Sequence, residues 1–244
     1  MPITRRIVFT GPGRSGTAWL AQVLPLLLPP GFEVEHEPFN QEGLPHTAAA
    51  WINRAWMRDR SWVLVSHYAR DAIDQLAAVA DSWVMIWRNP DDVLRSYLTR
   101  RTFTSQFGAN VAPGTRLRVL ARQQYGDLAA TLGLLRLADC DVQHVLFEQA
   151  CDPGPGGLRG LLGDLGLRVP AENLAGTSAL PYPPPANATP GELVIDAEQF
   201  SLEDLGAVRR TVRGLPQVAG AIRSARDRFA TMYEREPPPW TWDF

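Results

Sequence analysis

Residues 6–20 read RIVFTGPGRSGTAWL, and the rest of the chain can be interpreted outward from this segment. Residues 6–10 are an apolar run typical of a buried β-strand, and the glycine-rich residues 11–16 follow it directly. From Thr17 to Leu28 the spacing is helical, and Pro29 is expected to end the helix. A strand, a glycine-rich turn and a helix N-terminus together form an anion site, because backbone N–H groups and the helix dipole point into the turn. The segment therefore predicts a loop that holds a phosphate-bearing nucleotide.

The segments that follow alternate between strand-like and helix-like patterns. Such alternation predicts an α/β fold: a three-layer parallel sheet flanked by helices on both faces. Ligands of these sheets bind at the carboxyl ends of the strands, so the end of the first strand, His67 and Arg88 are expected to face one crevice. The expected strands cover residues 32–36, 61–66, 83–87 and 142–147, and the expected helices cover residues 47–58, 69–79, 91–101, 115–137 and 157–165.

The pattern weakens after Pro170. Residues 181–190 (PYPPPANATP) are rich in proline, which excludes regular helix and central strand and favours an extended wrap or a lid. Helical spacing returns over residues 200–234. We therefore predict an α/β core over residues 1–170 and a helical C-terminal extension of the same domain over residues 171–244.

Size and composition narrow the class of protein. The chain has 244 residues, 45% of them hydrophobic, and a net charge of −2, which suits one α/β domain and gives no footprint for nucleic acid. All 24 basic side chains are arginine, so no lysine can serve as acid, base or Schiff-base nucleophile. The N-terminus lacks a signal-peptide core, and no apolar run is long enough to span a membrane. With two unpaired cysteines, we expect a soluble, cytoplasmic protein.

The glycine-rich loop nearly fits the nucleoside-triphosphate signature GxxxxGK[ST]. Gly11 and Gly16 have the required spacing, but Thr17 follows directly and the lysine is missing. No strand ends in an evident magnesium-binding aspartate, and no His, Cys or Asp cluster has metal-ligand spacing, so no metal is expected. The loop could alternatively be an ordinary tight turn in which Ser15 or Thr17 caps the helix.

A second motif, WRNPDDVLRSYLTRR, occupies residues 87–101. Arg88 is expected at the end of a buried strand and Ser96 on the second turn of the following helix. A guanidinium and a hydroxyl placed in this way could hold a second, separate phosphate. An arginine that only caps a strand and a serine on a helix surface would give the same pattern.

Together the two motifs resemble those of the sulfotransferases that use 3′-phosphoadenosine 5′-phosphosulfate (PAPS). The family's [PG]-[KR]-S-G-T-x-W-L loop matches residues 13–20, and its R-N-P-x-D-x-x-x-S-Y motif matches residues 88–97. A weaker third match covers residues 145–167, and the resemblance spans residues 5–170. It implies a P-loop-like fold, PAPS as co-substrate, adenine against Trp19, and the 3′-phosphate on Arg88 and Ser96. The 5′-phosphosulfate would be held by Gly13, Arg14, Ser15, Gly16, Thr17 and Ala18.

Sulfuryl transfer also needs a cation for the leaving group and a base for the acceptor hydroxyl. Arg14 is the candidate cation. His67 resembles the family's histidine base, whereas Glu37 in EHEPFN resembles the carboxylate of carbohydrate sulfotransferases, and both stay open as the base. His36 should point away from Glu37 if that segment is extended. His46 and His144 are interpreted as bystanders.

The hypothesis is thus a sulfotransferase that moves the sulfuryl group of PAPS to a hydroxyl of a small molecule, glycan or lipid. A non-catalytic nucleotide-binding protein of the same fold and a P-loop kinase are the alternatives. The family's late R-K-G segment has no good match, and Arg209, Arg210 or Arg213 could replace it. The oligomeric state stays open. The acceptor is equally open, although an apolar acceptor pocket could be lined by Phe39, Trp51, Trp56 and Phe103.

Overall fold

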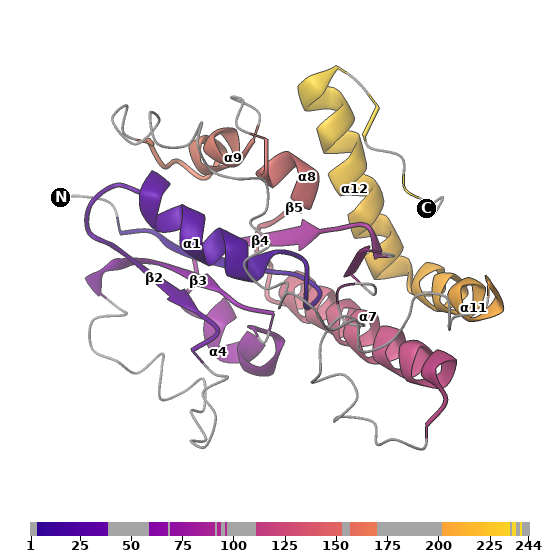
Figure 1. Ribbon diagram of the computed structural model, residues 1–244. Helices are drawn as coiled ribbons and strands as arrows, with labels where there is room; N and C mark the ends of the chain where they lie inside the picture. Colours follow the sequence, from indigo (N-terminus) through magenta and orange to yellow (C-terminus); the bar gives the residue numbers. More distant parts are fainter. Residues whose placement is uncertain are drawn as a thin grey trace, which may run out of the picture.

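The structure is a computed structural model (Figure 1). It describes residues 4–38, 59–67, 69–90, 92–93, 96, 111–152, 157–169, 202–234, 236–237 and 240. Several features singled out in the sequence lie outside these residues: the expected helix 47–58, the proline-rich residues 181–190, His46, and the aromatic side chains Phe39, Trp51, Trp56 and Phe103.

Five parallel strands form one sheet in the order β2-β3-β1-β4-β5. β1 lies at the centre, where Phe9 is paired with Val65 on one side and with Val84 on the other. The predicted strands and their parallel arrangement are confirmed to within one residue at their ends: β4 begins one residue earlier, and β3 and β5 each end one residue earlier, β5 because Phe147 opens helix α8. The strands are β1 (Arg6–Thr10), β2 (Phe32–His36), β3 (Ser61–Val65), β4 (Ser82–Trp87) and β5 (Val142–Leu146).

Helices cover both faces of the sheet, so the three-layer α/β architecture is confirmed (Figure 1). Side chains alternate along β1: Ile7 and Phe9 pack under one layer, and Val8 packs under the other. The first layer comprises α1 (Thr17–Leu27), α8 (Phe147–Ala150) and α9 (Leu158–Asp164). The second comprises the 3-10 helix η1 (Ala69–Ala72), α4 (Ile73–Ala77), α7 (Pro113–Leu137), α11 (Leu202–Arg213) and α12 (Pro216–Tyr233).

The stretch over residues 200–234, where helical spacing was predicted, contains the two helices α11 and α12. The backbone N–H of Gly214 still donates to the Arg210 carbonyl, but Leu215 is extended and Pro216 occupies the first turn of α12. Proline has no N–H to continue a helix but fits a helix start, which explains the break. Beyond α12, Trp240 is buried in the core, and the guanidinium of Arg226 lies 5.3 Å from its ring centre.

No helix within the described ranges is both long and apolar enough to cross a membrane.

Candidate active site

The carboxyl ends of all five strands lie at one edge of the sheet, as in any parallel arrangement. Each strand is followed there by a residue or loop that could take part in binding or catalysis. In spatial order these are Glu37 after β2, His67 after β3, the loop 11–16 after β1, Arg88 after β4 and Phe147 after β5. This edge is therefore the candidate active site.

The glycine-rich loop turns sharply before α1. Ser15 N–H donates to the Pro12 carbonyl at 3.0 Å, and Arg14 has a left-handed backbone with φ of 69°. Gly16 is the N-cap of α1 with φ of 103°, and it has no side-chain capping bond. The alternative in which Ser15 or Thr17 caps the helix is therefore wrong. The first N–H groups of α1 have no intrahelical acceptor, so an anion is a suitable partner for them.

Two glycines keep this loop compact. A Cβ atom placed at Gly11 would clash with the Ile86 carbonyl oxygen and would lie 2.7 Å from Ser15 Oγ. One placed at Gly16 would clash with the ring of Phe147. Ser15 itself is fully buried, and its hydroxyl has no hydrogen-bond partner among the described residues. The loop thus combines open backbone donors with a buried hydroxyl, which are groups that a phosphate can satisfy.

Hydrogen bonds join the loop to the second motif. Arg14 Nε donates to Ser96 Oγ at 2.8 Å, and Arg88 Nη1 donates to the Arg14 carbonyl at 3.2 Å. The resemblance assigns Arg14 to one end of a nucleotide and Ser96 to the other. The structure brings both to one place, so the two motifs are in direct contact.

Phe147 is a site residue that the sequence interpretation missed. Its ring touches the loop at Gly16, lies 5.2 Å from the guanidinium carbon of Arg88, and meets Trp19 edge-on at 5.8 Å between ring centres. The ring therefore contacts both motifs, the loop at Gly16 and the guanidinium of Arg88. Trp19 is only 8% exposed, and its contact with adenine stays a prediction. No local signal marks Phe147 in the sequence, where it is the last apolar residue of the expected strand 142–147.

Burial affects two ionisable groups beside Phe147, Glu148 and Cys151. Burial raises the pKa of Glu148, an effect that nearby Arg88 opposes and Asp92 reinforces. Burial, reinforced by Glu148, raises the pKa of Cys151 to about 12. A thiol with such a pKa stays protonated at neutral pH, which makes Cys151 a packing residue rather than a nucleophile.

At the other half of the edge, the two candidate bases touch each other. The backbone N–H of Glu37 donates to the Val65 carbonyl at 3.0 Å, which extends the β2–β3 pairing past the end of β2. Glu37 Oε1 then lies 2.5 Å from His67 Nδ1, and their side chains are 18% and 16% exposed. Glu37 and His67 thus form a hydrogen-bonded pair that is partly shielded from water.

The remaining described histidines have different surroundings. His36 was expected to point away from Glu37, but its Nε2 lies 3.6 Å from Glu37 Oε1. The expectation is wrong because Glu37 has a left-handed backbone with φ of 46°, so the segment is not extended. Burial lowers the pKa of His36, opposed by Glu37. His144 accepts a hydrogen bond from Trp87 Nε1 at 3.2 Å, and burial lowers its pKa to about 4, as suits a packing residue.

Gln124 on α7 was also missed. Gly13 N–H donates to Gln124 Oε1 at 3.2 Å, across 111 residues of sequence. No local motif marks this residue, because the contact exists only once α7 has packed near the loop.

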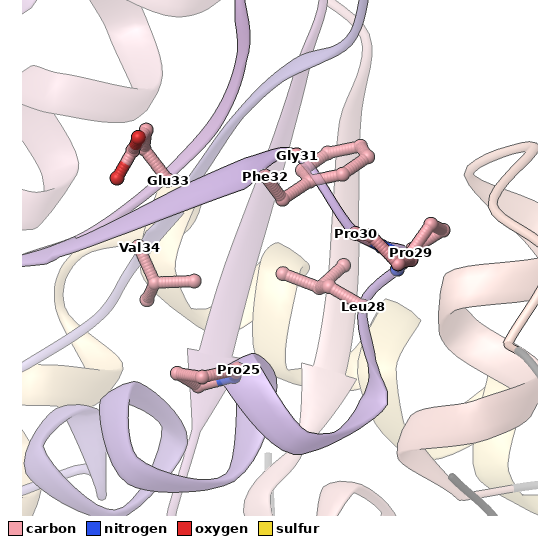
Figure 2. Close-up of a pocket in the computed structure, with 8 residues that line it drawn as sticks. All are labelled: Pro25, Leu28, Pro29, Pro30, Gly31, Phe32, Glu33 and Val34. Carbon is pink, nitrogen blue, oxygen red and sulfur yellow. The ribbon is translucent and has the colours of Figure 1, made fainter. Parts of the chain in front are cut away.

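The described part of the chain holds no group of three His, Cys, Asp or Glu side chains placed to bind a metal ion. A cavity of about 450 Å³ lies away from the site edge, between the end of α1 and the start of β2. Figure 2 shows Pro25, Leu28 and Val34 directed into it, while Glu33 points to the other side of the strand. This cavity carries no candidate catalytic group.

The fold defines the class of architecture: a P-loop-like α/β protein with a five-stranded parallel sheet flanked by helices. The crystal structure of mouse sulfotransferase SULT7A1 complexed with PAP is similar, with a TM-score of 0.54 and 14% sequence identity over 95% of this chain and 89% of the mouse protein. At this identity the likeness establishes the fold. No family model matches the sequence. No curated protein matches it either.

Proposed function

We propose that the protein is a PAPS-dependent sulfotransferase that transfers the sulfuryl group to a hydroxyl of a small-molecule acceptor. The observation that carries the proposal is the convergence of Arg14, Ser96 and Arg88 beside the open amides of α1. Two cationic side chains at one edge of the sheet suit a nucleotide with phosphates at both ends of its ribose. The PAP-bound neighbour with this fold supports the same nucleotide class.

The loop residues would hold the 5′ end of the nucleotide. Amides of the first turn of α1 and the buried Ser15 hydroxyl would donate to phosphosulfate oxygens. Arg14 would stabilise the negative charge that develops on the leaving oxygen, and it keeps its own charge at any working pH. Arg88 and Ser96 would hold the 3′-phosphate, and the Phe147 ring beneath Arg88 limits where that guanidinium can move.

The pair of Glu37 and His67 would handle the proton of the acceptor. Sulfuryl transfer forms an S–O bond to the acceptor oxygen and breaks the S–O bond to the 5′-phosphate oxygen, and the acceptor proton must leave. If Glu37 accepts the Nδ1 proton of His67, the Nε2 atom keeps its lone pair and can take this proton. We therefore assign His67 as the base and Glu37 as the group that orients its ring.

The acceptor would approach along the β2–β3 part of the edge, because the base must lie within hydrogen-bond reach of its hydroxyl. Cys140 and Cys151 are both unpaired, which is compatible with a reducing compartment, and we propose a cytoplasmic location.

Transfer of a labelled sulfuryl group from PAPS tests the proposal. The protein is incubated in EDTA with separate phenol, primary-alcohol and sugar acceptors. We expect labelled product from at least one acceptor class, a loss of at least about 100-fold in His67→Ala, and unchanged yield in Arg60→Ala, whose exposed side chain pairs with Glu33 away from the site. The proposal fails if PAPS yields no product with any class while PAP binds normally.

A further inference from the structure

Helix α7 carries a polar residue in the stripe that faces the core. Side chains spaced three and four residues apart along this face are buried and almost all apolar. Gln124 interrupts the stripe where the helix passes the glycine-rich loop, and it is only partly buried. The buried neighbours along the stripe are Leu117, Leu120, Ala121, Tyr125, Leu128, Thr131 and Leu135.

The chemistry of the contact fixes which end of the Gln124 amide meets the loop. A backbone N–H can only donate, so the carboxamide oxygen must face Gly13, at 3.2 Å. The NH2 group of Gln124 is then on the other side, and the structure records no acceptor for it among the described residues. The side chain is neutral, so it adds no negative charge beside a site built for anions.

Gly13 is a sensitive point of the loop. It is the second residue of the turn that Ser15 N–H closes onto the Pro12 carbonyl. The next residue, Arg14, has the left-handed backbone that directs its carbonyl to Arg88 and its side chain to Ser96. The hydrogen bond to Gln124 holds the Pro12–Gly13 peptide plane, whose carbonyl accepts the Ser15 N–H, and so holds the turn in which Arg14 lies.

We propose that Gln124 is a positioning residue that holds the loop in its anion-binding shape, an inference that rests on the proposed function. By satisfying Gly13 N–H, it fixes the turn so that Arg14 and the α1 amides converge on the 5′-phosphosulfate. It acts through the loop and not on the 3′ half of the nucleotide. A carboxylate in its place would keep the hydrogen bond but repel the anion.

Isothermal titration of matched glutamine variants tests this role. Gln124→Met keeps the length of the side chain but removes the hydrogen bond, and Gln123→Met makes the same change at an exposed neighbour on α7. We expect the Kd for PAP to rise at least about fivefold in Gln124→Met and to stay within twofold in Gln123→Met. Adenosine 3′-monophosphate lacks the 5′ group, so its Kd should stay within twofold in both variants.

Hydrogen exchange of the Gly13 amide supplies a readout that needs no nucleotide. We expect exchange to accelerate at least fivefold in Gln124→Met and to return to the wild-type rate in Gln124→Glu, which restores the acceptor oxygen. PAP binding should stay weak in Gln124→Glu because of its charge.

Contrary results would distinguish a failure of the Gln124 proposal from a failure of the proposed function. The inference is overturned if Gln124→Met binds PAP as tightly as wild type does. It is also overturned if the variant raises the Kd for PAP and for adenosine 3′-monophosphate by the same factor. If wild-type protein binds no PAP, the proposed function is wrong. Separately, an unchanged exchange rate of the Gly13 amide in Gln124→Met would show that Gln124 does not hold the loop.

Discussion

The two halves of the candidate site, at the same edge of the same sheet, differ in charge and in proton chemistry. The β1–β4 half carries Arg14 and Arg88, two fixed cations tied together through a backbone carbonyl. The β2–β3 half carries Glu37 and His67, a carboxylate and an imidazole 2.5 Å apart. The first half can neutralise phosphates but cannot move protons near neutral pH, whereas the second half can.

Under the proposed function, this difference would give the two halves separate tasks. The cationic half would bind the nucleotide and stabilise the leaving group, and the Glu37–His67 half would activate the acceptor. Both halves contain one non-glycine residue with a left-handed backbone, Arg14 and Glu37. Strained backbones of this kind are often found at functional sites. Variants in the cationic half should therefore change nucleotide binding, and variants in the Glu37–His67 half should change turnover.

The largest effect is expected in the Glu37–His67 half. His67→Ala removes the base and should lower kcat for sulfuryl transfer by about 10²- to 10⁴-fold. The Kd for PAP should stay within twofold, because His67 does not belong to the cationic half. His36→Ala is the control and should keep kcat within about fivefold. Steady-state kinetics and isothermal titration measure both quantities, and a parallel loss of affinity in His67→Ala would contradict the division.

Arg88→Ala should have the converse effect. Loss of a charge-assisted hydrogen-bond donor from the 3′-phosphate site is expected to weaken PAP binding about 100-fold. At saturating PAPS, kcat should fall much less. Arg60→Ala, a change of the same type at an exposed position, should bind PAP as wild type does. Equal affinity in Arg88→Ala and wild type would remove Arg88 from the nucleotide site.

A pair of glycine variants, one in the cationic half and one outside the site, separates the effect of backbone strain from that of side-chain contact. Gly16 and Gly31 both have left-handed backbones, with φ of 103° and 95°, but only Gly16 has a neighbour that a Cβ atom would strike. We expect Gly31→Ala to lower the free energy of unfolding by about 1 kcal/mol and Gly16→Ala by about 3 kcal/mol. Urea denaturation measures both, and equal losses would show that the Gly16–Phe147 contact matters little.

The smallest effect concerns a histidine outside the catalytic pair. The pKa of His144, about 4 when folded, lies below its ordinary value of 6.5. Between these pH values the unfolded state binds more protons, so the free energy of unfolding should fall as pH falls. His144→Asn keeps an acceptor for Trp87 but cannot titrate. Its free energy of unfolding should therefore fall by on the order of 2 kcal/mol less than that of the wild type across this pH range. Urea melts at pH 6.5 and 4 check the difference. Equal pH dependence in both proteins would contradict it.

Much of the site edge could be predicted from the sequence, because local patterns encode it. The apolar strands, the glycine-rich loop and the motif around Arg88 all have local signals, and the parallel sheet follows from their alternation. Gln124 and Phe147 have no such signal, because their roles arise only when α7 and β5 pack near the loop. The pairing of Glu37 with His36 was missed since it depends on the left-handed backbone of Glu37.

Binding of PAP to the wild-type protein in EDTA tests the central claim most directly. At a PAP concentration of 100 times the Kd, the nucleotide should stabilise the fold by about 2.7 kcal/mol, which raises Tm by about 5 to 10 °C for a chain of this size. ATP with Mg²⁺ should give a much smaller rise. No rise with PAP, or a rise only with ATP and Mg²⁺, would contradict the assignment of this loop to a sulfotransferase.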